Sequence, residues 1–524
     1  MRKRYDFFID VAQFPLVTLL IAVILLGTGN ILVNPSTAIL WKPTNHYVIL
    51  ASACLRMFGG AIVMLFPLSV LIALLNKRFE EVFASLIGVI SYIVILITTM
   101  FFASDKLPAD AYSSMLGIGT GVLESSRVMG VVRYPLQLGI LASFICYVLT
   151  KHCFERTRNR KTYGLFSFID KNTMALLLVI VYSFAAGIAI SYVWKYFILG
   201  LYQVFAFIAD DITNPFNLFL YGVIEKLMAL LNMVHIPRNA FWFTELGGSW
   251  LDSLGRKYVG DVAIWTAQIT SGSIARGTGR FITPNYMIQM FALPGYIVAL
   301  FTLVSNRFEK RKYISFMVIA IVASILCGNA LPFELFMFCA SPLLFFFHVG
   351  ISGMLYAVFE WAKIFIGFSY TGSALFASVG SLADLLVYFK SATMIGSLSF
   401  ILILGVVIFG LYFLATRIYY RYLAIDMFQV GKEKQLVEQL VDCLGGIENI
   451  KIVDRNIFKL LVQVKSDQIV DVMRLRKLCF SKVFESKTGY VLYFYKASPK
   501  LYDSIKVQMK EYEDYQRRGG PNLR

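Results

Sequence analysis

The segment FPLVTLLIAVILLGTG, residues 14–29, contains no charged side chain. It belongs to a longer apolar run over residues 12–33, and a helix needs about 20 apolar residues to cross a bilayer. A secretory signal peptide is the alternative for such a run, but this one is too long, and its small residues at 36–38 lie beyond a full span. We therefore expect a retained membrane-spanning helix.

The composition extends this expectation to most of the chain. The 524 residues are 58% hydrophobic and 15% charged, with a mean hydropathy of +0.68, which is typical of a polytopic helical membrane protein and not of a large soluble enzyme. Apolar runs predict spans over residues 12–33, 49–75, 82–102, 136–150, 173–194, 286–304, 314–326, 333–357 and 392–415. Residues 198–234 are less uniformly apolar and predict an amphipathic or re-entrant helix.

Lysine and arginine gather in short segments between these runs. The clusters are Arg2, Lys3 and Arg4; Lys77 and Arg78; Lys151, Arg156, Arg158, Arg160 and Lys161; Arg307, Lys310, Arg311 and Lys312; Arg417 and Arg421. Because basic loops stay cytoplasmic, we expect a protein of the cell membrane with both termini in the cytoplasm. The net charge of +17 then reflects this bias and attraction to anionic lipid, and no polybasic arm with interleaved aromatics suggests nucleic acid.

Cysteine and histidine provide no pattern for a disulfide framework or a metal centre. The seven cysteines form no CxxC pair, most fall in apolar segments, and there are only four histidines. We therefore expect no disulfide scaffold, no zinc site and no cofactor.

The composition changes near residue 426, after which the pattern is that of a small α+β domain. Phe458, Leu460, Val462 and Val464 alternate as in a half-buried strand. The complete prediction is a helix (433–444), strands (449–453 and 458–464), a helix (468–479), strands (482–485 and 490–495) and a last helix (499–517). The predicted organisation is a membrane domain (1–425), a linker (426–431) and a cytoplasmic domain (432–524).

Two stretches within the membrane region carry polar groups in apolar surroundings. Residues 221–243 contain Glu225, Lys226, His235 and Arg238. In residues 327–338, Gly328, Asn329 and Pro332 interrupt an apolar run just before Glu334. Ionisable groups at this depth are costly unless they are paired or line a cavity, and an interrupted helix exposes backbone groups that need partners. Together these residues predict a substrate site.

A purely structural interpretation remains open for each of these residues. Glu334 can be an ion-pair partner of Lys226 or Arg238 in a helix bundle, and His235 can cap a helix or bind its backbone. A second, glycine-rich segment, SGSIARGTGR at residues 271–280, presents Arg276 and Arg280, which either hold an anion or belong to an ordinary loop.

Several motifs resemble the enzyme IIC permease of the phosphoenolpyruvate-dependent phosphotransferase system, in its glucose, N-acetylglucosamine and maltose branch. NMVHIPRNAFW (232–242) is similar to the family pattern GLHHxxN followed by FW, and GNALPFELFMFCASPLLFFFH (328–348) is similar to GITEPIEFxFxFxAPLLYxxH. RFITPNYMIQMFALPGYIVAL (280–300), the first two apolar runs and LGGIENIKIVD (444–454) also match, the last one in the family's IIB domain.

The resemblance implies a fold and a chemistry. The fold has about ten transmembrane helices with re-entrant hairpins, forms a dimer, and carries a IIB-like α+β domain after the IIC region. In the family, phosphate passes from a IIA protein to a cysteine of IIB and then to the C6 hydroxyl of the sugar. A thiolate suits this task because it is nucleophilic near neutral pH.

The chain departs from the family at the positions that carry this chemistry. The IIB cysteine opens the pattern CxTRLR, and here Asn456 stands at that position, followed by Phe458, Lys459 and Leu461. In the membrane motifs the first histidine is Val234, the asparagine is Arg238, and the threonine and first glutamate of ITEP are Ala330 and Leu331. An amide nitrogen does not accept phosphate, so we expect no catalytic residue at Asn456 and improbable phosphotransfer by this chain.

Three functions follow from this comparison. The first is a hexose-type sugar permease that relies on another IIB or works without phosphorylation. The second is an inactive paralogue that senses sugar or binds a regulator through its tail. The third, and weakest, is a phosphotransferase with an unconventional acceptor. The partners implied are a sugar, membrane lipid, a second copy of the chain, and a IIA-type or other IIB protein.

Overall fold

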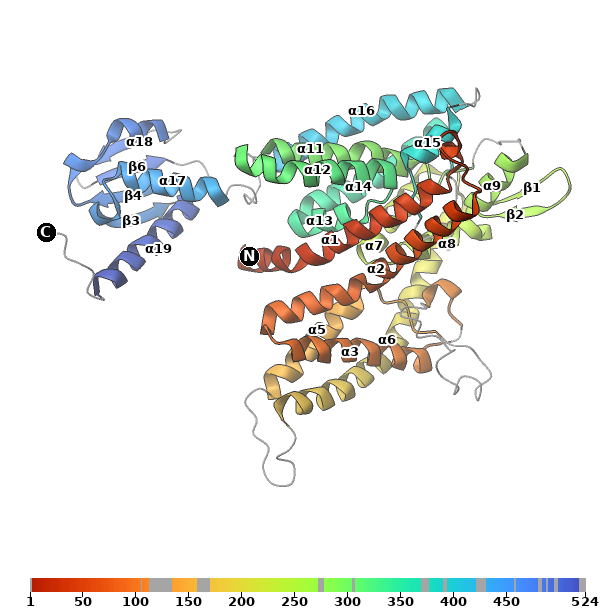
Figure 1. The fold of residues 1–524 in the computed structure, drawn as a ribbon, viewed down its shortest axis with the longest axis horizontal. Coiled ribbons are helices and arrows are strands. Elements are labelled where there is room, and N and C mark those ends of the chain that lie inside the picture. The colour runs from red at the N-terminus through yellow and green to blue at the C-terminus, as the bar shows by residue number, and fades with distance from the viewer. Residues whose placement is uncertain are drawn as a thin grey trace. The chain divides into compact units, whose positions relative to one another are not determined.

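The computed structural model describes residues 2–104, 106–112, 134–157, 170–271, 278–303, 307–368, 377–389, 394–420, 430–456, 459–478, 483–486, 489–493 and 498–517. The chain divides into two compact units (Figure 1). The helical body comprises Met1–Phe301 and Lys312–Arg417, and the tail unit comprises Thr302–Arg311 and Ile418–Arg524. The assignment of the body as the membrane domain and of the tail unit as the cytoplasmic domain stays a prediction.

The helices of the body fall into two runs along the chain. The first contains α1 (Arg2–Leu32), α2 (His46–Phe79), α3 (Val82–Phe102), α5 (Ile140–Thr157), α6 (Lys171–Asp210), α7 (Pro215–Leu230) and α8 (His235–Phe243). The second contains α9 (Asp261–Ser271), α10 (Pro284–Met287), α11 (Leu293–Leu303), α12 (Arg307–Cys327), α13 (Leu331–Ala340), α14 (Pro342–Ala362), α15 (Leu382–Tyr388) and α16 (Ile395–Ile418). A π-helical turn, Ile288–Ala292, joins α10 to α11.

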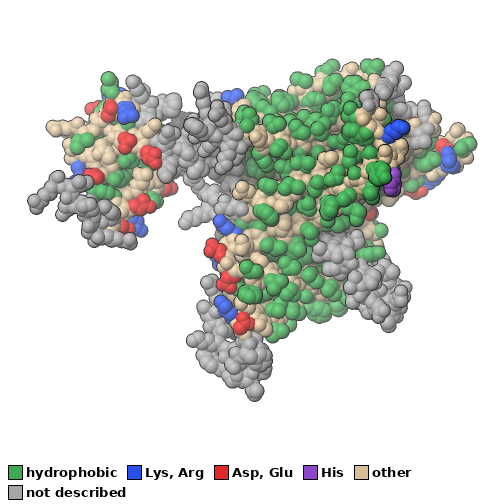
Figure 2. Space-filling view, viewed as in Figure 1, with side chains coloured by type: hydrophobic (Ala, Val, Ile, Leu, Met, Phe, Trp, Pro, Cys, Tyr) green, Lys and Arg blue, Asp and Glu red, His purple; other side chains and the backbone are tan. Residues whose placement is uncertain are grey.

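Seven helical segments in the described part of the chain are long and apolar enough to cross a membrane: Val11–Leu32, His46–Phe79, Val82–Phe102, Lys171–Asp210, Pro284–Leu303, Pro342–Ala362 and Ile395–Ile418. Two shorter apolar helices are Ile314–Cys327 and Leu331–Ala340. Figure 2 shows hydrophobic side chains over much of the visible face of the body, with charged ones near the ends of its helices. This is a polytopic membrane protein; the number of about ten spans and the orientation of the termini stay predictions.

Two predicted elements of the body are corrected by the structure. The single span expected over residues 333–357 is two helices, α13 and α14, which are separated at Ser341 because Pro342 begins a new helix. The single amphipathic or re-entrant helix expected over residues 198–234 is instead two elements, the end of α6, which continues to Asp210, and α7, which begins at Pro215. A hairpin of two short strands, β1 (Ser249–Leu251) and β2 (Lys257–Val259), was not predicted because three-residue strands leave little periodicity.

Helices α1 and α2 approach each other closely through small residues. A Cβ atom on Gly29 would meet the Ser52 carbonyl oxygen at 3.0 Å, and one on Gly59 would meet the Ala22 carbonyl oxygen at 2.7 Å. The hydroxyl of Ser52 donates to the Gly29 carbonyl over 2.7 Å. Small residues at such crossings allow backbones to pack without a hydrophobic driving force between helices.

Pro67 in the middle of α2 lacks the backbone N–H that would bond the Val63 carbonyl. The side-chain amide of Asn232 lies 3.4 Å from that carbonyl oxygen, and the hydroxyl of Ser143 donates to the carbonyl of Pro67 itself. Side chains from two other segments therefore satisfy backbone groups that water cannot reach.

The tail unit contains a four-stranded antiparallel sheet in the order β3-β4-β6-β5. Its elements are α17 (Val430–Cys443), β3 (Ile450–Asn456), β4 (Lys459–Val464), α18 (Val472–Leu478), β5 (Val483–Ser486), β6 (Gly489–Tyr493) and α19 (Ser498–Arg517). The order of helices and strands is the predicted one. Most of the predicted linker lies outside the described residues, and α17 begins earlier than expected, at Val430.

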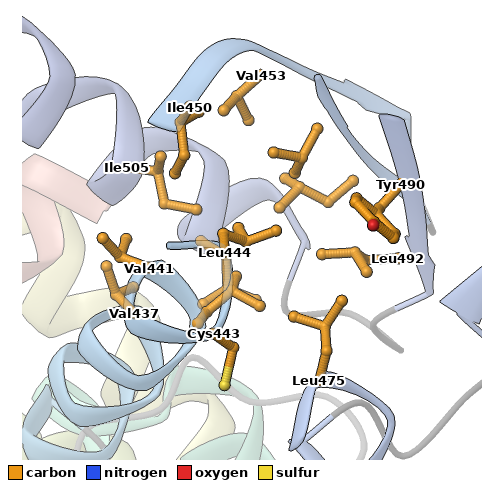
Figure 3. Close-up of a cluster of buried hydrophobic side chains, with 14 residues drawn as sticks. Val437, Val441, Cys443, Leu444, Ile450, Val453, Leu475, Tyr490, Leu492 and Ile505 are labelled. Atoms are coloured by element: carbon orange, nitrogen blue, oxygen red, sulfur yellow. The ribbon is translucent and has the colours of Figure 1, made fainter. Parts of the chain in front are cut away.

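One face of the sheet and the three helices enclose the core of the tail. The buried side chains are Val437, Leu440, Val441, Cys443, Leu444, Ile450, Val453, Leu460, Val462, Leu475, Tyr490, Leu492, Leu501 and Ile505 (Figure 3). Leu460 of β4 is fully buried while its neighbour Leu461 is 40% exposed. This alternation is the two-residue period of a strand with one covered face.

The position of Asn456 differs from the prediction. It was expected between two strands, over residues 449–453 and 458–464, but it ends β3 and pairs across the hairpin with Lys459, the first residue of β4. Phe458 lies outside the described residues. Asn456 therefore stands at a hairpin end of the sheet.

Candidate functional site

The interruption predicted at Gly328 separates α12 from α13. Gly328 has a φ of +60°, and a Cβ atom there would meet the backbone nitrogen of Ser381 at 2.9 Å. Only glycine combines this left-handed backbone with so close a neighbour. The chain then starts α13 at Leu331, which brings Glu334 into the first turn of a helix inside the body.

Glu334 is buried and accepts a hydrogen bond from Lys226 of α7. The Lys226 Nζ and Glu334 Oε1 atoms are 2.8 Å apart, and neither side chain is more than 3% exposed. The structure therefore contains the ion pair that the structural interpretation expected. A pair at this depth is costly to build.

The same Glu334 oxygen is 3.3 Å from Nε2 of His348 in α14. The other ring nitrogen, Nδ1, is 2.8 Å from the hydroxyl of Tyr412 in α16. His348 and Tyr412 are fully buried. Three helices thus supply one hydrogen-bonded chain that ends on the carboxylate.

Glu225, the residue before Lys226, forms a second buried pair. Successive residues of a helix point about 100° apart, so the Glu225 side chain faces different partners. Its Oε1 accepts from Nε of Arg238 in α8 over 2.8 Å, and its Oε2 accepts from the hydroxyl of Tyr356 in α14 over 2.6 Å. The amide of Asn285 donates to that hydroxyl oxygen over 3.0 Å.

Four of the six predicted binding residues therefore meet in two ion pairs that share α7. The other two, His235 and Asn329, are half-buried and have no printed contact with either pair. The ring of His235 bonds the backbone of Asp110, and its Nδ1 atom is buried without a hydrogen-bond partner in the described part of the chain. The side-chain oxygen of Asn329 accepts from the backbone N–H of Leu331, the first residue of α13.

The glycine-rich segment ends in a third buried group of charges. Asp261 accepts from the backbone N–H groups of Gly279 and Phe281 over 2.7 and 3.1 Å. Arg280 lies between Gly279 and Phe281 in the sequence, and its Nε is 3.5 Å from Oε2 of Glu360. Glu360 also pairs with Lys363. Arg280 thus already faces a carboxylate, and Arg276 lies outside the described residues.

His348, Tyr356 and Tyr412 belong to the buried network but were not among the predicted site residues. They lie in largely apolar stretches, and their spacing did not single them out. His348 did carry a signal, because it closes the second membrane motif, whereas the tyrosines have none that a single sequence reveals.

The tail offers no described thiol in place of the missing cysteine. Cys443 is buried in the core of the tail, and burial raises the pKa of its thiol, so it remains protonated and weakly nucleophilic. Cys479 lies outside the described residues.

Comparison with known proteins covers nearly the whole chain. No protein-family model matches it. The chain is 23% identical over 517 residues to the glucose-specific EIICBA component of the phosphotransferase system of Staphylococcus saprophyticus, an alignment that covers 94% of this chain and 72% of that protein. It is 24% identical over 524 residues to the glucoside-specific EIICBA component of Staphylococcus carnosus, with 96% and 72% covered. Over nearly its whole length the chain is therefore similar to glucose-type IIC–IIB permeases of the phosphotransferase system.

Proposed function

We propose that the protein is a permease that binds a hexose-type sugar in its helical body and carries it across the plasma membrane. The observation that carries this proposal is the match to a glucose-specific and a glucoside-specific component over 94% and 96% of the chain. A match confined to the tail would support a regulatory role equally well. The alignments here cover at least 94% of the chain, so they extend far beyond the tail.

The buried charges around α7 support a binding site in that body. Glu334 and Glu225 each present a carboxylate, and Lys226, Arg238 and His348 present donors, all within a protein interior. Sugar hydroxyls donate and accept hydrogen bonds, so they suit a site in which both kinds of group lie close together. We assign Glu334 the central role because Lys226 and His348 both bond it.

We further propose that this chain does not itself transfer phosphate. Asn456 occupies the position of the IIB cysteine, and the described cysteine of the tail, Cys443, is buried. The IIB-like tail then serves as a docking or structural domain. The protein works either with phosphate supplied by another IIB or by equilibrating its sugar.

The test is uptake of labelled glucose, N-acetylglucosamine and maltose into liposomes that contain the purified protein, followed by analysis of the sugar recovered inside. We expect entry of at least one sugar in unphosphorylated form. Glu334→Gln should reduce the initial rate by on the order of tenfold or more, since a hydrogen bond to a charged group contributes about 1.5–3 kcal/mol. Glu245→Gln is the matched control, because Glu245 is exposed and pairs with Lys257.

Two outcomes would contradict the proposal in different ways. Sugar recovered as its phosphate after addition of the general pathway proteins, with no other IIB present, would show that phosphotransfer is intact. No entry of any sugar into liposomes that hold folded protein would favour the alternative, a sugar sensor or interaction protein of this family.

A further inference from the structure

Glu334, His348 and Tyr412 form a hydrogen-bonded series in which both ring nitrogens of His348 have an oxygen partner. The titratable imidazole thus lies between a carboxylate and a hydroxyl. The members of the series come from α13, α14 and α16, and each is at most 2% exposed. A histidine with both nitrogens bonded in the protein interior costs free energy to bury, which a leucine would avoid. Buried ionisable groups within a membrane region are functional candidates for this reason.

The geometry fits a neutral imidazole that carries its proton on Nε2. Nε2–H then donates to Glu334, and the Tyr412 hydroxyl donates to Nδ1. A hydroxyl is also an acceptor and can rotate. A second proton on Nδ1 therefore needs only that the Tyr412 hydrogen turn away, and no helix has to move.

The charges around the ring are balanced before that proton arrives. From α7, Lys226 compensates Glu334, while Glu225 is compensated by Arg238 of α8. Asn285 of α10 is neutral and bonds Tyr356 of α14. Glu360, also on α14, faces Arg280 and Lys363. From α16 comes the neutral Tyr412. An added proton makes the Glu334 group positive by one charge, which is unfavourable in the interior unless another change accompanies it.

We infer that sugar movement through this protein is coupled to movement of a proton carried by His348. The inference rests on the proposed permease function and on Glu334 as a sugar contact. A sugar hydroxyl that bonds Glu334 in place of Lys226 leaves the carboxylate without its cation, and a proton on His348 restores that compensation. Sugar and proton occupancy therefore favour each other, and this linkage is reciprocal. The proton enters with the sugar from outside, resides on Nδ1 of the imidazolium, and leaves to the cytoplasm, and no covalent bond to the sugar forms.

Proton coupling would supply the driving force that a phosphate-free permease lacks. For one proton per sugar, a difference of one pH unit supports at most about tenfold accumulation, because one pH unit corresponds to about 1.4 kcal/mol. A permease without coupling only equilibrates its sugar.

The test uses the complete protein in liposomes buffered at pH 7.5 inside and placed at pH 7.5 or 6.5 outside. The probe is labelled glucose, N-acetylglucosamine or maltose, whichever enters at equal pH, and an entrapped pH dye reports protons. We expect transient accumulation of up to about tenfold at pH 6.5, loss of accumulation with a protonophore, and acidification of the interior on addition of sugar at equal pH.

The variant is His348→Gln, whose amide group donates to Glu334 and whose oxygen accepts from Tyr412 but which takes no proton. In this variant the amount of sugar inside the liposomes should be about the same with pH 6.5 outside as with pH 7.5 outside, so that the ratio of the two falls to about one. His152→Gln, at an exposed position of α5, should behave like the wild type. If His348→Gln does not fold, accumulation and acidification in the wild type still decide whether sugar movement is coupled to proton movement.

The two proposals fail in distinguishable ways. Entry of sugar at equal pH, with neither accumulation under the gradient nor acidification, would overturn proton coupling and leave the permease intact. Absence of entry under both conditions would overturn the permease function and the coupling together.

Discussion

The Nζ atom of Lys226 lies 2.8 Å from Oε1 of Glu334, although the two residues are 108 positions apart in the chain. Helix α7 contributes the lysine, and the short helix after the break at Gly328 contributes the glutamate. Both side chains are buried, so the pair joins the two segments that the sequence marked as polar. It is the contact through which binding, stability and the proposed coupling can be tested separately.

Lys226→Met should destabilise the protein severely. It leaves Glu334 buried next to His348 without its cation, and removal of one partner of a buried pair costs about 3–5 kcal/mol. Thermal unfolding in detergent should show a large fall in the midpoint, and Lys226→Met combined with Glu334→Gln should recover part of it. Arg78→Met is the control, because Arg78 and Glu155 form an exposed pair that contributes at most about 1 kcal/mol. Equal effects of the two single variants would contradict the assignment of a buried pair.

Gly353→Leu should separate α7 from α14, whereas Gly350→Leu should be tolerated. A Cβ atom on Gly353 would meet the backbone oxygen of Phe219 at 2.9 Å, and one on Gly350 has nothing within 4 Å. Separation of these helices would pull Tyr356 away from Glu225, so we expect loss of sugar uptake and a lower unfolding midpoint with Gly353→Leu alone. A Gly353→Leu protein as stable as Gly350→Leu would show that the close approach does not matter.

Leu460→Ala should destabilise the tail much more than Leu461→Ala. Leu460 is fully buried in the core of the tail and Leu461 is 40% exposed. Loss of a buried leucine costs about 2–5 kcal/mol, while an exposed change usually lies within about 0.5 kcal/mol. Hydrogen exchange of β4 in the complete protein should report the difference, with faster exchange only in Leu460→Ala. The same exchange in both variants would mean that the face assignment of β4 is wrong.

The wild-type tail should take no label from radioactive phosphoenolpyruvate in the presence of the general pathway proteins and a IIA protein. The physical reason is that the amide of Asn456 is not a phosphate acceptor and that Cys443 is buried and protonated. Asn456→Cys restores a thiol, but we expect it to take only a weak label, since Lys459 and Leu461 replace the two arginines of the family pattern. Denaturing gels of the labelled protein provide the measurement, and labelling of the wild type would contradict the proposed loss of phosphotransfer.

The fold of the tail could be predicted from sequence almost element by element. Alternation of residues such as Leu460 and Val462 depends on local backbone geometry, and a two-residue period reports which side chains turn toward the core. The end of β3 at Asn456 was missed because Asp454, Arg455 and Asn456 are polar, so the apolar pattern of the first strand stops at Val453. The boundary lies in a turn that alternation does not mark.

The sequence by itself determined that this is a helical membrane protein and that Glu225, Lys226, Arg238 and Glu334 stand in apolar surroundings, because apolar runs and the charges within them can be recognised along one chain. It did not single out Asp261, Glu360 and Asp384, which are also buried. Only the tertiary structure decided how those charges are paired: Lys226 with Glu334, Arg238 with Glu225, and His348 between Glu334 and Tyr412. It also decided that residues 333–357 are two helices. The physical reason is that pairing depends on which helix faces come together in space, and residues far apart in sequence have no local signal of the partner they will meet.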